Sequence, residues 1–341
     1  MKLHLRHLFY AVTLGLLGLT SCQKDVTEFD AGTSASQTKI LLGGEIVQEN
    51  KTRVNDSGFC DGDQIGIFIT DYTPEGAGIL QNEGNRADNV RHTFSESANR
   101  WIPSRDIYWK DTKTHIDVYG FYPHSGVTDV NAQGFEVQLD QRTTAEQGKM
   151  GGYEASDFLW AKATDVAPPD RVITLKFGHK MSFIKVRLQM GSGWTAEEWA
   201  AAHKQVVLRN MVCKASVDMS TGEVTPVGGA SERGITPYRV GDEFRAVVIP
   251  QTLQANTPLF TISVGESDTR FYKKSVDETF MGSKLHTYDL KVKKNTATGE
   301  IELESVGESI TLRESDAVSH DAMARAYIVA DVQTPGTLKE T

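Results

Sequence analysis

Few residues of this sequence have the types and spacings that chemistry at a site would need. His115 and Asp117 share one face of an extended segment and His124 follows, which gives three possible metal ligands in no established ligand spacing. Asp140 and Asp157 flank an acidic, glycine-rich loop whose oxygen atoms could hold calcium. The spacing of that loop matches no defined calcium-binding loop, so neither group predicts a metal site.

Motifs of catalysis are absent from the sequence. There is no glycine-rich phosphate loop, no Gly-x-Ser-x-Gly nucleophile elbow and no His-Glu-x-x-His zinc motif. His179 lies between two strand-like runs, and we expect a structural histidine near a strand end. Two aromatic clusters, residues 108–109 and 119–122, would offer a carbohydrate-stacking platform if exposed and a sandwich core if buried. We therefore predict no catalytic residue, no metal and no cofactor, so an enzyme is not expected.

The cysteine at position 22 closes what has the features of an export signal. A basic start precedes residues 8–19, which are apolar and too few to span a bilayer of roughly 30 Å. Leu19-Thr20-Ser21-Cys22 resembles a bacterial lipobox, which implies cleavage before Cys22 and acylation of its thiol and new amino group. Each buried CH₂ of an acyl chain contributes about 0.8 kcal/mol, so several chains form a stable anchor. We predict a signal peptide at 1–21 and lipidation of Cys22.

Composition narrows the class of protein further. The chain has 341 residues and a formal charge of -9, which argues against nonspecific binding of nucleic acid. Residues 22–37 are small and polar, and they predict a flexible tether. Cys60 and Cys213 are far apart in the sequence, so we expect two buried free thiols, although export would permit a disulfide.

Short runs rich in Val, Ile, Phe and Tyr fill most of the chain. Several alternate apolar and polar residues with a period of two, as residues 184–188 do, which is typical of a strand with one buried face. Turn residues separate these runs, and the pattern predicts an all-β sandwich architecture. One helix is predicted at 195–207, where Thr195 and Glu198 form a capping-box pattern. The strand-like runs are 62–72, 115–124, 171–179, 181–190, 244–252, 259–266, 270–276 and 286–294.

Several of these segments together resemble the fimbrillin family of exported bacterial lipoproteins, the subunits of type V pili. The order and spacing of the matching segments between residues 53 and 292 carry the resemblance. It implies two tandem transthyretin-like β-sandwich domains, here 38–190 and 191–294, followed by a C-terminal extension at 295–341. The matching segments are 62–63, 65–68, 107–109, 117–123, 157–161, 175–181, 248–252 and 282–290.

The resemblance also implies a mechanism of assembly. In this family the lipidated precursor reaches the outer membrane, and an arginine-specific protease cuts after an arginine early in the mature chain. The removed piece had supplied the first strand of the N-terminal domain. Its loss exposes an apolar groove, and a strand from another subunit fills that groove by main-chain pairing.

The matching first strand in this chain is predicted at residues 38–47. Its removable apolar residues are Ile40, Leu42 and Ile46, with Ile40 and Leu42 on one face. The pair Gly43–Gly44 predicts a bend or a bulge.

Arg53, in the polar loop that follows, is the candidate cleavage site, because proteolysis concentrates in exposed loops. The donor strand is expected from the C-terminal extension, where a break in alternation at 305–306 requires a bulge. The length of the extension departs from the family pattern and leaves stalk, tip and anchor roles open. The donor candidates are Ile301, Leu303, Val306, Ile310 and Leu312.

Two functions follow from this resemblance. The first is a surface-exposed pilus subunit, stalk or tip, that is held at the cell outer membrane by its lipid, pairs with other pilus subunits by strand addition and serves adhesion to a host or bacterial surface receptor. The alternative is a non-polymerising outer-membrane lipoprotein that anchors a pilus or binds a glycan or host protein. Neither function involves nucleic acid.

Overall fold

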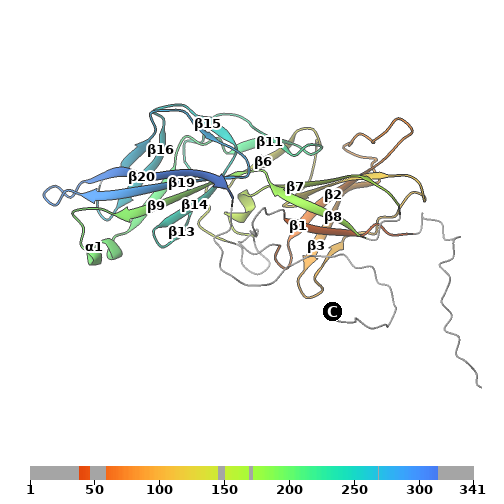
Figure 1. The fold of residues 1–341 in the computed structure, drawn as a ribbon, viewed down its shortest axis with the longest axis horizontal. Coiled ribbons are helices and arrows are strands. Elements are labelled where there is room, and N and C mark those ends of the chain that lie inside the picture. Colours follow the sequence, from red (N-terminus) through yellow and green to blue (C-terminus); the bar gives the residue numbers. More distant parts are fainter. Residues whose placement is uncertain (1–37, 47–58, 145–149, 169–171, 268, 314–341) are drawn as a thin grey trace, which may run out of the picture. The chain divides into compact units, whose positions relative to one another are not determined.

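The computed structural model describes residues 38–46, 59–144, 150–168, 172–267 and 269–313 (Figure 1). The predicted signal peptide, the tether, Cys22 and Arg53 lie outside these residues. Strands dominate the described chain, so the all-β prediction is confirmed. The described residues contain one α-helix, α1 (Ala196–Ala201), and none of their helices has the length and hydrophobicity to cross a membrane.

A seven-stranded sheet is built from the first half of the chain. Its order is β1-β8-β7-β5-β2-β3-β4, and every neighbouring pair is antiparallel except β1 and β8, which run parallel. Within the described residues β1 and β4 are therefore the outermost strands. The strands are β1 (Leu42–Ile46), β2 (Gln64–Asp71), β3 (Ala87–Ser95), β4 (Arg100–Pro103), β5 (Ile116–Tyr122), β7 (Leu159–Val166) and β8 (Ile173–His179).

A five-stranded sheet, ordered β13-β14-β9-β19-β20, dominates the second half. Three smaller sheets accompany it, ordered β10-β16-β17, β12-β11-β6 and β15-β18. The strands are β6 (Gln133–Glu136), β9 (Ser182–Met190), β10 (Lys204–Leu208), β11 (Lys214–Asp218), β12 (Glu223–Pro226), β13 (Tyr238–Val240), β14 (Glu243–Val248), β15 (Gln251–Leu253), β16 (Pro258–Val264), β17 (Arg270–Lys273), β18 (Glu278–Phe280), β19 (Lys284–Lys294) and β20 (Ile301–Leu312).

The chain changes from the seven-stranded to the five-stranded sheet between β8 and β9. Strand β9 thus pairs with β14 and β19, although the sequence assigns residues 181–190 to the N-terminal domain. Strand β6, from the first half, pairs with β11 of the second half. The division into two domains stays a prediction.

The aromatic segments of the fimbrillin resemblance lie in the core. Tyr119, Phe121 and Tyr122 on β5 are 4%, 1% and 0% exposed, and Trp109 is 1% exposed, whereas Tyr108 is 40% exposed. Successive residues of β5 contribute to two different buried clusters, because both faces of this strand are covered. The core interpretation of these aromatics is confirmed for all but Tyr108.

Steric constraints explain why two positions of the matching segments are glycine. A Cβ on Gly66 of β2 would lie 2.2 Å from the Phe121 ring and 2.4 Å from Asn89 Oδ1. A Cβ on Gly120 of β5 would lie 2.8 Å from both Leu175 and Phe177. The aromatic residues of this sheet therefore pack directly on glycine backbone, which no larger residue permits without movement.

The predicted helix is shorter than expected. Its capping box is present, because Thr195 accepts from the Glu198 backbone and the Glu198 side chain accepts from the Thr195 backbone. The helix ends at Ala201, and β10 begins at Lys204 and pairs with β16. The prediction of helix up to residue 207 is wrong, because β-branched Val206 and Val207 are buried in this strand pair.

Because His92 on β3 is buried, we expect the folded chain to lose stability in acid. Its Nδ1 lies 3.1 Å from Val90 O, and burial lowers its pKa from 6.5 to about 4. The unfolded chain binds a proton below about pH 6.5 while the folded chain does not. The stability from a neutral His92 is therefore present above pH 6.5, and about 3 kcal/mol of it is lost as the pH falls to 4.

Urea unfolding at pH 7 and at pH 4, for the wild type and for His92→Asn, measures this loss. The variant should lose less stability between the two pH values than the wild type. Comparing the two chains removes the contribution of other groups that titrate in the same window, such as Asp63, whose pKa burial raises to about 6. Equal losses in both chains would contradict the prediction.

Candidate functional site

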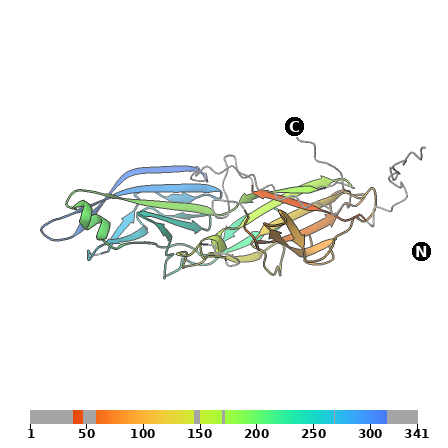
Figure 2. The ribbon, with the colours of Figure 1, turned by 90° about the horizontal axis from the view of Figure 1, so that it is seen from below.

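The first described segment closes one side of the seven-stranded sheet. Strand β1 pairs in parallel with β8 over all five of its residues, and the two strands lie side by side in Figure 2. Just before β1, Ile40 N donates to Ile107 O at 2.8 Å and Trp109 N donates to Thr38 O at 3.0 Å. Residues 38–46, called the plug segment below, thus lie between β8 and the stretch that follows β4.

The plug segment inserts apolar side chains into an aromatic cluster. Ile40 and Leu42 are 6% and 1% exposed, in the same buried cluster as Trp101 and Phe177. Leu41 is only half-buried, as the predicted alternation of faces requires. Full burial of such a side chain contributes about 1.5–3 kcal/mol, so these two residues add to the attachment that main-chain pairing with β8 provides.

The two glycines of the plug segment do not form the predicted bulge. The register between β1 and β8 continues without a shift through Gly43 and Gly44, so the bulge prediction is wrong. A Cβ on Gly44 would lie 3.1 Å from the Phe177 ring and 3.2 Å from Trp101 Nε1. The glycine allows the aromatic side chains to approach the strand. Ile46, the third predicted residue, ends β1.

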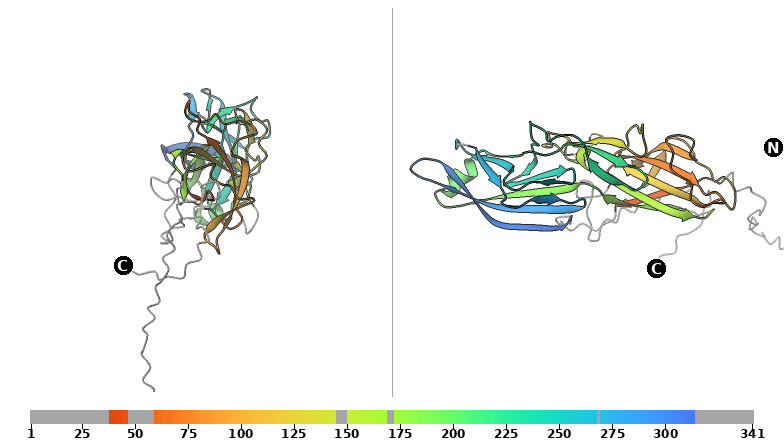
Figure 3. Two further views of the ribbon diagram at one scale, coloured as in Figure 1. Left: turned by 90° about the vertical axis from the view of Figure 1, so that its right-hand side faces the viewer. Right: turned by 90° about the horizontal axis from the view of Figure 1, so that it is seen from above.

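The predicted donor residues lie on β20, in the sheet of their own chain. Strand β20 pairs antiparallel with β19 along its length and lies at the outer edge of the sheet in Figure 3. Ile301 is buried and Leu303 packs partly buried against the core. In contrast, Val306, Ile310 and Leu312 are 41%, 52% and 42% exposed. The strand is buried at its start and half-exposed towards its end.

A bulge interrupts β20 where the sequence predicts one. Asp289 pairs with Gly307, but the next residue of β19, Leu290, pairs with Ser305. Val306 is the extra residue of this register shift. The predicted bulge at 305–306 is confirmed, and it keeps apolar residues of both halves on the face that looks toward the core.

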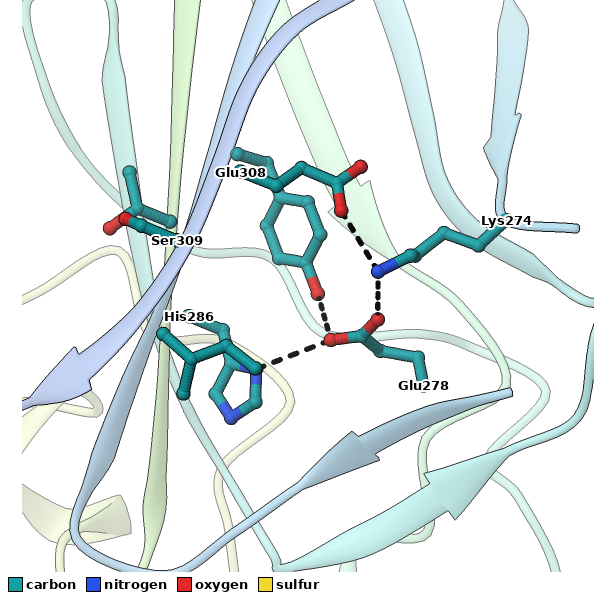
Figure 4. Close-up of a pocket in the computed structure, with 8 residues that line it drawn as sticks. Lys274, Glu278, His286, Glu308 and Ser309 are labelled. Carbon is teal, nitrogen blue, oxygen red and sulfur yellow. Dashed lines mark hydrogen bonds and ion pairs between the residues drawn. The ribbon is translucent and has the colours of Figure 1, made fainter. Parts of the chain in front are cut away.

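A polar pocket of about 250 Å³ lies beneath the second half of β20 (Figure 4). Glu308 of β20 points into it, and its Oε2 lies 2.9 Å from Lys274 Nζ. Tyr272 donates to the same carboxylate, and burial together with Glu308 raises the pKa of Tyr272 to about 12. A carboxylate of β20 is thereby held by two residues from β17 and the loop after it.

The floor of this pocket is a second carboxylate. Glu278 on β18 is 6% exposed and forms an ion pair with Lys274. Its Oε1 accepts from Tyr288 OH at 2.9 Å and lies 3.3 Å from His286 Nδ1 (Figure 4). Burial lowers the pKa of His286, so this histidine favours the neutral form. The polar groups of the pocket mainly satisfy one another.

The residue that follows β20 is a buried arginine. The Arg313 side chain is 6% exposed, and its Nη1 lies 2.7 Å from Asp157 Oδ2 and 2.8 Å from His179 Nδ1. Its guanidinium carbon lies 3.6 Å from the centroid of the Phe183 ring. Burial raises the pKa of Asp157, but the interactions with His179 and with the Arg313 guanidinium outweigh it and hold that pKa below the usual value.

Comparison with known families comes to the same conclusion as the sequence resemblance. A family model described as fimbrillin-like matches residues 52–306, which is more than half of the chain. The chain belongs to the fimbrillin-like family. The plug segment and β20, which carry the predicted site residues, lie at the two ends of the described chain. The family match covers neither the plug segment nor the end of β20.

Solved structures share the fold of this fimbrillin-like chain. A candidate cell adhesion protein from Bacteroides uniformis has 15% identity and a TM-score of 0.58, with 80% of this chain and 98% of that chain covered. One from Bacteroides ovatus has 16% identity and a TM-score of 0.58, with 80% and 96% covered. No protein with a curated description matches the sequence. At these identities the likeness concerns the fold alone.

The residues considered as metal ligands have other partners in the fimbrillin-like chain. His115 Nδ1 lies 2.7 Å from Asp165 Oδ1, and the buried Asp117 lies 3.3 Å from Lys162 Nζ. Asp140 forms an ion pair with its neighbour Arg142. Across the described ranges, no group of three or more His, Cys, Asp or Glu residues could hold a metal ion.

Cys60 and Cys213 do not form a disulfide with each other, as predicted from their spacing. Cys213 is buried as predicted, whereas Cys60 is partly exposed, so the predicted burial of Cys60 is wrong. Burial, with Glu136 nearby, raises the pKa of Cys213 to about 11, so the thiol stays protonated near neutral pH. Such a thiol is a poor nucleophile.

Proposed function

We propose that this chain is a pilus subunit of a bacterial surface that assembles by strand exchange and serves adhesion. Membership of the fimbrillin-like family supports the role. The observation that carries the mechanism is the plug segment, which completes a sheet from its edge and precedes the candidate cleavage site Arg53. A strand in this place can be removed while the pairing among the other six strands of the sheet stays intact.

Removal of the plug segment would create an acceptor groove. Strand β8 would lose its pairing with β1, and the cluster around Trp101 and Phe177 would lose Ile40 and Leu42. An incoming strand would restore main-chain hydrogen bonds along β8 and would set its register through side chains at alternate positions. The occupant we propose is a strand of another pilus subunit.

We propose that lipidation of Cys22 holds the precursor at the outer membrane on the cell surface until it enters the fimbria. The polar residues between Cys22 and the plug segment provide the length of a tether. We further propose two tandem β-sandwich domains, with the change between them between β8 and β9. A host or bacterial surface receptor would be the target of adhesion.

The donor strand has two possible sources in this chain. Strand β20 carries the predicted donor residues, but it is paired with β19, so donation would require its release. The sequence after Arg313 contains another apolar run, at residues 326–330. A chain truncated after Arg313 keeps the first source and lacks the second.

Cleavage by an arginine-specific protease tests the mechanism. Residues 23–341 contain every described element, and brief digestion should cut after Arg53, release the plug segment and convert monomers into oligomers, as measured by mass spectrometry and light scattering. Arg53→Lys keeps the charge but resists this protease, so it should keep the plug segment and stay monomeric. A cut chain that loses the plug segment and remains monomeric would overturn the mechanism.

The truncated chain identifies the donor in the same experiment. Oligomers formed by a cut chain that ends at Arg313 would assign donation to β20. Monomers from this chain, with oligomers from the full chain, would assign it to residues 314–341.

One observation favours a second function. Because β20 is paired within its own sheet, the chain resembles a subunit that accepts a strand or none rather than one that donates. We propose as the alternative a non-polymerising outer-membrane lipoprotein, either a pilus anchor or a module that binds glycan or host protein. In that case cut wild type and Arg53→Lys should both stay monomeric.

A further inference from the structure

The second half of β20, residues 305–312, is attached by few apolar contacts. Ile310 and Leu312 stand opposite His286 and Lys284 of β19, on the strand face that looks toward the core, yet both are about half exposed. The first half differs, because Ile301 and Leu303 pack against the main apolar cluster. Apolar burial therefore fixes the start of the strand much more firmly than its end.

In addition to the main-chain pairing with β19, two polar side-chain contacts hold the weakly packed half. Glu308 reaches down to Lys274 and Tyr272, as described for the pocket beneath the strand (Figure 4). One residue beyond the strand, Arg313 enters a buried site where Asp157 supplies the counter-ion. The Arg313 backbone N also donates to Ser283 O at 3.2 Å.

We propose that Glu308 and Arg313 form a latch that keeps residues 305–312 on their own sheet, and that opening the latch frees this half of the strand while the first half stays bound. The bulge at Val306 marks the point of separation, since the ladder is already interrupted there. Arg313 is the stronger member because its site is buried, whereas the Glu308 side chain is 34% exposed.

The latch brings the end of β20, a candidate donor strand, next to β8, the strand that would accept a donor. His179, which contacts Arg313, is the last residue of β8, and β8 is the strand that carries the plug segment. Asp157 lies just before β7, the other neighbour of β8. The existence of the latch does not depend on polymerisation, whereas its use in releasing a donor strand rests on the proposed function.

Hydrogen exchange of backbone amides tests the latch in residues 23–341. Arg313→Ala should raise exchange in residues 307–312 at least tenfold and leave β9 and β14 protected. Arg270→Ala is the matched control, because Arg270 contacts Ile301 O at 2.8 Å, at the opposite end of the strand. It should raise exchange near residue 301 and leave 307–312 unchanged.

Glu308→Gln is the second variant, since it keeps the shape of a half-exposed residue and cannot be expected to prevent folding. It should raise exchange in 307–312 by a smaller factor than Arg313→Ala. Unchanged exchange in both variants would overturn the latch, and so would an equal rise in every strand of the sheet.

Assembly after cleavage at Arg53 separates the latch from the proposed function. Faster exchange in 307–312 with no oligomers from any cut chain would leave the latch in place and reject strand exchange. Oligomers from the cut wild type with unchanged exchange in both variants would support strand exchange and reject the latch.

Discussion

Asp157→Asn should destabilise the folded chain by about 3–5 kcal/mol, the usual effect of removing one partner from a buried ion pair. The Asp157 side chain is 2% exposed and lies between His179 and Arg313. Asparagine keeps the volume and removes the charge. The guanidinium of Arg313 would then be buried without the counter-ion that Asp157 supplies, unless the end of β20 moved out of its site.

Urea unfolding at pH 7, followed by tryptophan fluorescence, measures this loss. Because the pKa of Asp157 is held below its ordinary value, the stability from its charged form is present above about pH 4 and is lost as the pH falls through the folded value. A measurement at pH 7 therefore records the whole contribution. Asp140→Asn is the matched control, since that carboxylate is 58% exposed and should change stability little.

A double variant distinguishes the loss of the attraction between Asp157 and Arg313 from the cost of burying the Arg313 charge without Asp157. Asp157→Asn with Arg313→Met removes both charges, so its loss of stability should be smaller than the sum of the two single losses. An additive double variant, or an Asp157→Asn that loses no more than Asp140→Asn, would contradict the assignment of a buried ion pair.

The strands that the sequence predicts best are those with both a clear pattern and clear turns. The predicted runs 62–72, 115–124 and 181–190 correspond closely to β2, β5 and β9. Lys185 is different, since the alternation places it on a wet face, yet it is 8% exposed and lies 3.8 Å from Glu243. A period of two identifies a strand, but it does not show whether a neighbouring loop or strand covers the polar face.

Pairing partners could not be predicted from local patterns. Nothing within the plug segment indicates that it runs parallel to β8, more than a hundred residues later, because parallel pairing depends on a long connection. Residues 87–95 form β3 although their polar composition gave no strand signal. The sheet recruits such segments through main-chain hydrogen bonds that any sequence without proline can supply.

The candidate site could be predicted only in part, because alternation indicates which side chains are buried but not which segments pair. Ile40 and Leu42 show the alternation of a half-buried strand, and their burial follows from it. Asp157 and His179 attracted attention singly, as a calcium ligand and as a structural histidine. Arg313 did not, because its role depends on the path of β20, although its position directly after the alternating Ile310 and Leu312 was a usable signal.

Leu42→Asp should release the plug segment without any protease. Leu42 is 1% exposed among aromatic residues, where a carboxylate would have no partner. An unpaired buried charge costs several kcal/mol after relaxation. Undocking the segment gives up the burial of Ile40, at about 1.5–3 kcal/mol, and main-chain hydrogen bonds whose donors and acceptors water can then satisfy. Undocking is therefore the less costly response, and the variant should resemble the processed chain.

A synthetic peptide of residues 38–47 detects the open groove. It should bind Leu42→Asp and protect the amides of β8 from exchange, while the wild type, whose groove is filled, should not bind it. Lys39→Gln is the control within the same segment, since that side chain is 52% exposed and its change should leave the groove closed.

Two results would show that the plug segment is not a removable strand. A Leu42→Asp chain without a cooperative unfolding transition would mean that the segment is needed for folding itself. A folded variant that binds no peptide would mean that the groove collapses when it is empty. Peptide binding by a folded variant would establish the physical requirement of strand exchange, namely that the rest of the sheet remains ordered while its first strand is absent.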